Sequence, residues 1–140
     1  MVKRTDYKAA LMSIHPEFAQ LILDGKKRVE FRKTRFSLDI SYVVIYATAP
    51  IKKVIGYFKI QKIQVAAPTE LWKSYKEVAG IDKGAFQNYY GDMNQGVAIE
   101  IGEVYQLSQY IDLEHISKSL VAPQNYIYLE KDSFDSIRSC

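Results

Sequence analysis

A period-two alternation of apolar and charged residues stands out at residues 28–32. Val29 and Phe31 alternate with Arg28, Glu30 and Arg32, which is the pattern of a strand with one buried face. We therefore predict that Val29 and Phe31 face a hydrophobic core. The three charged side chains are then expected to line the opposite face of the same strand.

The remaining pattern predicts a mixed chain of strands and short helices. Apolar and β-branched runs predict strands at 8–14, 41–48, 54–65, 126–129 and from 96 to beyond 105. Helical spacing predicts helices at 16 to about 24, 68–79 and 82–90, with a short helical turn after Asp112. Because strands outnumber helices and do not alternate with them regularly, the pattern favours an α+β fold. We expect a small mixed β-barrel of about five to six strands flanked by helices, rather than a doubly wound sheet.

Two details of the predicted core can be tested directly. Alternation in the 54–65 strand places Val54, Gly56, Phe58 and Ile60 on one face, with Ile55, Tyr57 and Lys59 on the other. Gly56 indicates a bend or a close backbone approach. One barrel core is expected to hold Val29, Phe31, Ile45, Phe58 and Ile99, with Phe18, Leu21 and Ile22 packed on it from the first helix.

Length and composition indicate an ordinary globular chain. A length of 140 residues predicts one domain spanning residues 1–140. The single cysteine, Cys140, rules out an intramolecular disulfide and leaves too few thiols for a zinc cluster. The sequence offers no supporting cluster of histidines and carboxylates either, so we expect no metal, and we expect no cofactor. Neither a spanning apolar run nor a signal-like segment is found in the sequence, which predicts a cytoplasmic protein without membrane association.

Charge is distributed unevenly along the chain although the net charge is only +3. Residues 1–62 carry 13 basic and 5 acidic side chains, whereas residues 63–140 carry 6 basic and 11 acidic ones. Such a chain can present a basic face to a polyanion while staying near neutral overall. The alternative is that the asymmetry cancels on the folded surface.

Lys27, Glu30 and Arg32 form the most plausible polar constellation. A guanidinium can bind a phosphate or a base edge with two parallel hydrogen bonds, and a lysine supplies a point charge for phosphate. A glutamate can accept a hydrogen bond from the exocyclic amine of a base. The alternative is a structural ion network in which Glu30 only ties down Lys27 and Arg32.

Histidine and tyrosine offer further candidates. His15 precedes the first helix, where a backbone hydrogen bond is favoured over a role as general base. The tyrosines considered for stacking on bases are Tyr46, Tyr89, Tyr90 and Tyr126. Most tyrosines in a chain with 11 of them are nevertheless expected to be half-buried core residues, as is Trp72.

The segment from Gly25 to Arg32 resembles a known family. Gly25, Lys27, Glu30 and Arg32 match the GxKxxExR signature of ASCH domains, which are relatives of the PUA RNA-binding fold. Residues 11–16 resemble the family's first strand and helix entry, and residues 44–50 resemble its strand after the signature. A small bacterial, archaeal and phage subgroup of the family has further landmarks later in its sequences. They are similar to residues 80–82, Phe86, 89–91 and 123–126 of this chain. The resemblance covers nearly the whole chain.

The resemblance implies a PUA-like β-barrel with a cleft between the first helix and the barrel, floored by the signature strand. Relatives are thought to bind RNA or nucleotides there, and a few are enzymes. In one branch, similar to amidohydrolases of N-acetylated cytidine, a lysine at the position of Lys27 is the base and a threonine nucleophile lies at the position of Glu30. Glu30 has no hydroxyl for that route, and Glu77 is the nearest counterpart of the branch's acidic partner.

The leading expectation is a domain that binds RNA or a nucleotide-like ligand in a basic cleft. Its predicted ligand-binding residues are Lys27, Arg28, Glu30, Arg32, Tyr46, Thr48 and Tyr126. The alternative is a hydrolase in the same cleft, acting on a modified nucleoside or as a ribonuclease, with Lys27 and Glu30 as its catalytic residues. A protein-interaction module that shares only the fold is a third possibility.

Overall fold

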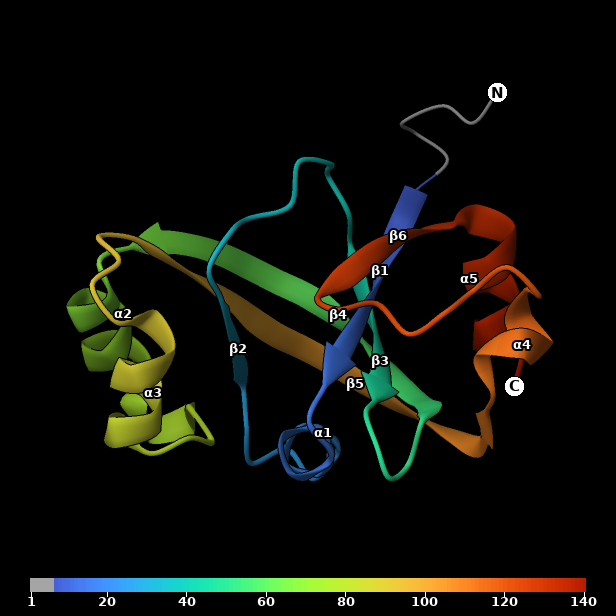
Figure 1. Ribbon diagram of the computed structural model, residues 1–140, viewed down its shortest axis with the longest axis horizontal. Helices are drawn as coiled ribbons and strands as arrows, with labels where there is room; N and C mark the ends of the chain where they lie inside the picture. Colours follow the sequence, from blue (N-terminus) through green and yellow to red (C-terminus); the bar gives the residue numbers. More distant parts are fainter. Residues whose placement is uncertain (1–6) are drawn as a thin grey trace.

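A computed structural model describes residues 7–140 as one mixed sheet with helices on both faces (Figure 1). The strands are β1 (Tyr7–Ile14), β2 (Val29–Arg32), β3 (Tyr42–Ala47), β4 (Lys53–Ala66), β5 (Gly96–Ile111) and β6 (Tyr126–Glu130). The helices are α1 (Pro16–Leu23), α2 (Pro68–Tyr75), α3 (Lys83–Tyr90), α4 (Leu113–Ile116) and α5 (Lys131–Arg138), and a 3-10 turn, η2 (Lys76–Val78), follows α2. The predicted α+β fold of about five to six strands flanked by helices is confirmed, and its six strands form one curled sheet. Among the described residues, no helix is long and apolar enough to cross a membrane.

The strand order is β2-β5-β4-β3-β1-β6. β1 runs parallel to β3, and the other neighbouring pairs are antiparallel. The long strands β4 and β5 curve across the whole molecule (Figure 1). The short β2 pairs with one end of β5. β2 and β6 are therefore the two edges of a curled sheet.

Within residues 7–140, three hydrophobic cores, rather than the predicted single one, stabilise the sheet. The α1 core lies on the face covered by α1 and contains Met12, Ile22, Ile45, Phe58 and Ile99. On the opposite face, the α5 core contains Leu11, Val44, Tyr57, Phe134 and Ile137. The α3 core contains Val29, Phe31, Leu71, Phe86 and Tyr90 at the β2 end of the sheet.

The expectation that Val29 and Phe31 share a core with Ile45 is therefore wrong. Both side chains are buried, as predicted, but they pack against α2 and α3. Alternation along β2 fixes which residues share a face, and it carries no information about which helix covers that face. Phe18 and Ile22 do pack on the α1 core, whereas Leu21 is only partly buried.

A β-bulge changes the predicted faces of β4. Val54 pairs with Tyr46 and Gly56 pairs with Ile45, so Ile55 is an extra residue on this strand. The shift sends Ile55 and Phe58 to the α1 core and Val54 and Tyr57 to the α5 core, because a bulge reverses the alternation beyond it. Gly56 makes the predicted close approach, since a Cβ there would lie 2.5 Å from the carbonyl oxygen of Tyr105.

The pattern of the sequence predicted one of two short helices, α3, and missed the other, α5. The helix predicted at 82–90 is α3, whose N-cap is Asp82; its carboxylate accepts a hydrogen bond of 2.8 Å from the backbone N–H of Ala85. The helix α5 was not predicted. Its buried residues Phe134 and Ile137 are three apart, a spacing that indicates one helical face.

Candidate nucleic-acid site

Lys27 lies in the turn that joins α1 to β2. Gly25 ends the helix at a φ of 78°, and the backbone N–H groups of Lys26 and Lys27 both donate to the carbonyl of Leu21. This closed turn directs the Lys27 side chain inward, where it is only 2% exposed. Its Nζ donates a hydrogen bond of 2.5 Å to the carbonyl oxygen of Ala79.

Gly80 completes the enclosure of Lys27. This glycine has a φ of +65°, and a Cβ built on it would lie 2.7 Å from Cβ and 2.8 Å from Cγ of Lys27. The aliphatic stem of Lys27 therefore occupies the space that any other residue at position 80 would fill. The segment after η2 fixes the ammonium group at one end and the stem along its length.

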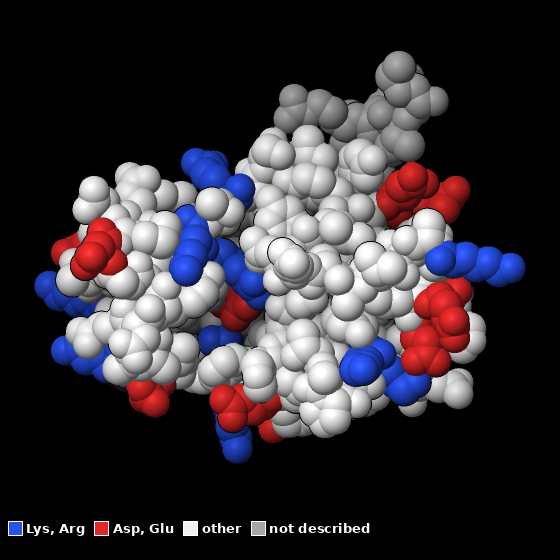
Figure 2. All heavy atoms as spheres, viewed as in Figure 1, with Lys and Arg blue, Asp and Glu red and all other residues white. Residues whose placement is uncertain are grey.

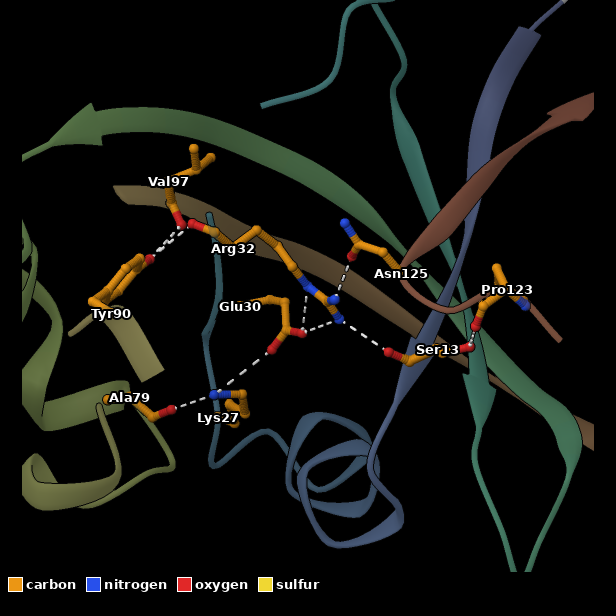
Figure 3. A network of polar contacts seen from close by, with 9 residues as sticks. All are labelled: Ser13, Lys27, Glu30, Arg32, Ala79, Tyr90, Val97, Pro123 and Asn125. Carbon is orange, nitrogen blue, oxygen red and sulfur yellow. Dashed lines mark hydrogen bonds and ion pairs between the residues drawn. The ribbon is translucent and has the colours of Figure 1, made fainter. Parts of the chain in front are cut away.

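Glu30 and Arg32 project from the same face of β2, as the alternation predicts. Oε2 of Glu30 accepts hydrogen bonds from Nε of Arg32 at 3.1 Å and from Nη2 at 2.7 Å. The other carboxylate oxygen, Oε1, lies 3.9 Å from Nζ of Lys27. Figure 3 shows the carboxylate between the two cations.

Arg32 also joins β2 to the opposite side of the curled sheet. Its Nη2 donates to the carbonyl of Ser13 at 3.0 Å, and its Nη1 donates to Oδ1 of Asn125 at 2.6 Å (Figure 3). In the described residues β2 forms a backbone ladder with β5 alone. The guanidinium therefore bridges β2 to β1 where no ladder does.

A pocket of about 160 Å³ opens beside these residues. Its polar lining residues are Ser13, His15, Lys27, Glu30 and Arg32. Its aromatic lining residues are Phe18 from α1, Phe31 from β2, and Phe86 and Tyr89 from α3. Figure 2 shows basic and acidic atoms recessed between the part of the molecule that carries α2 and α3 and the rest of the surface. The site thus lies between α1, β2 and α3.

Burial lowers the pKa of Lys27 from its ordinary value. The nearby Glu30 carboxylate opposes this effect, and the Arg32 guanidinium adds to it. Nζ of Lys27 also lies 5.3 Å from the centroid of the Phe18 ring and 5.5 Å from that of Phe31, so aromatic faces replace water around the charge. Burial likewise raises the pKa of Tyr89, which keeps that phenol protonated at neutral pH.

The structure brings together three of the predicted site residues, Lys27, Glu30 and Arg32. Arg28 lies outside the pocket, and its Nη2 donates to the carbonyl of Ile101 at 2.7 Å. Because β2 begins at Val29, the alternation of the strand does not extend to Arg28, and its side chain does not point to the face that carries Glu30 and Arg32. Lys27, in the turn before the strand, lines the pocket instead.

The other predicted ligand-binding residues lie elsewhere. Tyr46 is 6% exposed in the α5 core, so a stacking role for it is not supported. Tyr126 packs edge-on against Phe36 at a centroid distance of 4.8 Å. Thr48 uses its backbone N–H to bond the carbonyl of Ile14. None of the three lines the pocket.

Sequence reasoning missed several parts of the site. The side chain of Asn125 holds Arg32, although the chain separation of 93 residues gives no local signal. The His15 side chain makes no capping hydrogen bond to α1 and lines the pocket instead. Tyr89 was among the stacking candidates and does line it, whereas the Tyr90 hydroxyl donates to the carbonyl of Arg32 at 2.9 Å.

One cluster elsewhere has the residue types of a metal site. Ligand atoms of Asp112, Glu114 and His115 lie within 4.8 Å of one another. Asp112, however, accepts a hydrogen bond of 2.7 Å from Nζ of Lys53. An ammonium group in that position competes with a cation for the same carboxylate.

The chain resembles known proteins over most of its length. The sequence model of the ASCH domain family matches residues 12–116 of this chain. An "ASCH domain-containing ribonuclease" of Zymomonas mobilis is 30% identical over 139 residues, covering 96% of this chain and 93% of the relative. A crystal structure of ASCH from Zymomonas mobilis superposes with a TM-score of 0.87 at 29% identity, covering 98% and 96% of the two chains.

A further relative is much longer than this chain. The large ribosomal subunit protein uL22 of Ureaplasma parvum is 27% identical over 121 residues, which are 86% of this chain and 39% of the relative.

Proposed function

Because the chain belongs to the ASCH domain family, we propose that it binds single-stranded RNA, or a nucleotide-like ligand, at the pocket between α1, β2 and α3. The observation that carries the proposal is a lysine residue, Lys27, that is only 2% exposed beside a pocket whose other walls include four aromatic rings. Aromatic faces that stack on bases, combined with nearby cations, are the usual means by which proteins hold single strands.

The rim of the pocket supports the same proposal. Lys33 is exposed directly after β2, and its Nζ lies 4.9 Å from the centroid of the Tyr89 ring. Arg35 is exposed on the same segment of chain. These cations are free to contact phosphates in solvent, where each neutralised phosphate releases condensed counterions.

A salt titration tests the proposal. The binding of a fluorescent single-stranded RNA to wild type should weaken as salt rises, and Lys33→Ala should lower the slope of log K against log salt by about 0.7, the value for one phosphate contact on a single strand. Lys118→Ala is the matched control, because Lys118 is an exposed lysine that follows α4, away from the pocket. An RNA affinity that is unmeasurable in low salt, or the same slope in wild type and Lys33→Ala, would count against RNA binding at this rim.

A second candidate function is RNA cleavage at the same pocket. The relative from Zymomonas mobilis that is named a ribonuclease covers 96% of this chain, which favours this candidate over other hydrolytic reactions. Cleavage by internal attack needs a base that takes the proton of the 2′-hydroxyl as its oxygen bonds to phosphorus, and an acid that protonates the departing 5′-oxygen. Lys27 suits the first role because burial lowers its pKa. His15 lines the same pocket and can protonate a leaving group.

Product analysis separates binding from cleavage. End-labelled RNA incubated with wild type should remain intact if the protein only binds, and should yield 2′,3′-cyclic ends if it cleaves by internal attack. Lys27→Met keeps most of the stem and removes the ammonium, whereas Lys26→Ala removes an exposed charge one residue away. Cleavage lost in the first variant and kept in the second supports catalysis at this pocket, while cleavage kept in both indicates another site or a contaminant.

The amidohydrolase route has less support. Glu30 stands where that branch carries its threonine, and Oε2 of Glu30 is occupied by Arg32. Glu77, the nearest acidic counterpart, is exposed in η2 and does not line the pocket. We therefore do not assign this activity to the chain.

A further inference from the structure

We infer that the pocket receives an unpaired nucleobase by its hydrogen-bonding edge and excludes phosphate. The inference rests on the proposed RNA-binding function and specifies which part of the RNA enters. It is an alternative to the cleavage candidate, because cleavage by Lys27 and His15 requires a phosphate in the pocket. The reason for the inference is the set of hydrogen-bond donors and acceptors that remain available in the pocket once the protein's own contacts are made.

Arg32 has little capacity left for a ligand. A guanidinium carries five N–H donors, and four hydrogen bonds already join it to Glu30, Ser13 and Asn125. Its two edges are therefore committed within the protein. The paired hydrogen bonds by which arginine recognises a phosphate are not available without breaking this network.

Glu30 offers a hydrogen-bond acceptor that suits a base better than a phosphate. None of the described residues donates a hydrogen bond to its Oε1. Buried polar side-chain atoms without a partner are absent from the described part of the chain, so Oε1 faces the open pocket. A carboxylate oxygen in this position repels a phosphate and accepts a hydrogen bond from an N–H group.

Lys27 supplies the complementary donor. Its Nζ lies 3.9 Å from Oε1 of Glu30, and only one of its three N–H groups is needed for the carbonyl of Ala79. The pocket therefore presents an acceptor and a donor side by side. The Watson–Crick edge of an unpaired base offers the matching pair, an N–H next to a ring nitrogen or carbonyl oxygen, and this edge is what proteins read in single-stranded RNA.

The walls and size of the pocket favour the same ligand. The rings of Phe18 and Tyr89 are only partly buried and offer stacking faces, whereas Phe31 and Phe86 are buried and close the pocket with apolar surface. At about 160 Å³, the pocket is smaller than the about 300–1,000 Å³ of pockets that enclose drug-sized ligands, which suits one base better than a whole nucleotide.

The nearby start of α1 is also unsuited to phosphate. Pro16 at the first helical position has no N–H to donate, and Glu17 in the first turn adds a negative charge. The phosphates of a bound strand are therefore expected at the exposed rim near Lys33, outside the pocket.

The test uses short single-stranded RNAs of one sequence in which a single position at a time is made abasic. RNA should bind, and one abasic position should weaken binding by about 5- to 150-fold, the range that corresponds to the loss of one stacked base. Free nucleosides should compete with the RNA at high concentration, whereas inorganic pyrophosphate at equal ionic strength should not compete beyond its screening effect.

Glu30→Gln is the variant that tests the edge contact. Glutamine keeps the shape and a carbonyl oxygen for Arg32, and it turns an N–H₂ donor toward the pocket in place of Oε1. Wild type should prefer some nucleosides over others in competition, and Glu30→Gln should change their order while Lys26→Ala leaves it unchanged. Thermal unfolding of each variant checks that it is folded.

The outcomes separate the inference from the function on which it rests. RNA that binds equally well with any abasic position overturns the base pocket and leaves RNA binding intact. Nucleosides that bind while RNA does not would support the base pocket and overturn RNA binding. Competition by pyrophosphate that is stronger than that of nucleosides would also overturn the inference.

Discussion

Replacing Gly80 by alanine should destabilise the protein through Lys27. The added Cβ would lie 2.7, 2.8 and 3.0 Å from Cβ, Cγ and Cδ of Lys27, so the lysine stem must move. The left-handed backbone costs an L-residue about 1–2 kcal/mol, and losing the hydrogen bond from the ammonium to Ala79 costs about 1.5–3 kcal/mol more. We expect a total loss of about 2.5–5 kcal/mol in the free energy of unfolding.

Gly25→Ala is the matched control for this substitution. Gly25 also has a positive φ, of +78°, but nothing lies within 4 Å of a Cβ built on it. Its substitution should therefore cost only the backbone part, about 1–2 kcal/mol. Urea unfolding of both variants, monitored by circular dichroism, measures the difference.

A double-mutant cycle then assigns the extra cost to Lys27. Gly80→Ala combined with Lys27→Ala removes Cγ and Cδ of Lys27, two of the three atoms that the new Cβ meets, so the two substitutions should be less destabilising together than the sum of their separate effects. Equal losses for Gly80→Ala and Gly25→Ala, with additive behaviour in the cycle, would refute the argument that Gly80 holds the Lys27 stem in place.

Three further expectations follow from the core and the ion network. Phe31→Ala should lower the free energy of unfolding by about 3–5 kcal/mol, because Phe31 packs edge-on against Phe86 at a centroid distance of 4.8 Å; a loss below about 1 kcal/mol in urea unfolding would contradict its place in the core. Arg32→Ala should cost about 3–5 kcal/mol, since it leaves Glu30 with its carboxylate 90% buried and without its main partner, and Arg32→Ala combined with Glu30→Ala should recover part of that loss. The pKa of Lys27 is lowered by burial, so the unfolded chain binds this proton more tightly and folded wild type should gain stability relative to Lys27→Met as pH rises toward 10.5; parallel stability curves for the two proteins over that range would contradict the lowered pKa.

Local sequence pattern predicted most elements and missed features set by tertiary contacts. The alternation of β2 placed Phe31 in a core and Glu30 on the opposite face, because period two is a property of any strand. The bulge at Ile55 was not predictable from alternation, since the run of residues 54–58 contains no charged residue to mark an exposed face. The helix α5 carries only two buried apolar residues, too few for a clear periodic signal.

The candidate site divides in the same way. The spacing of Lys27, Glu30 and Arg32 was visible in the sequence, and the structure places all three at one pocket. Their chemistry was less predictable, because the partners that occupy Arg32 come from residues 13 and 125. The Arg32 guanidinium, which was expected to bind phosphate, instead joins the edge strand β2 to residues 13 and 125. The ligand contacts are therefore expected at Glu30 and Lys27.

The strand β5 has a consequence for how the protein opens. It supplies residues to all three cores: Val97, Ile99 and Ile101 to the α1 core, Leu107 to the α5 core and Ala98 to the α3 core. No core can lose its packing without exposing apolar side chains of this one strand, so we expect the cores to unfold as a single cooperative unit. In native-state hydrogen exchange, the paired amides of β5 should then exchange only through global unfolding and share one opening free energy from end to end.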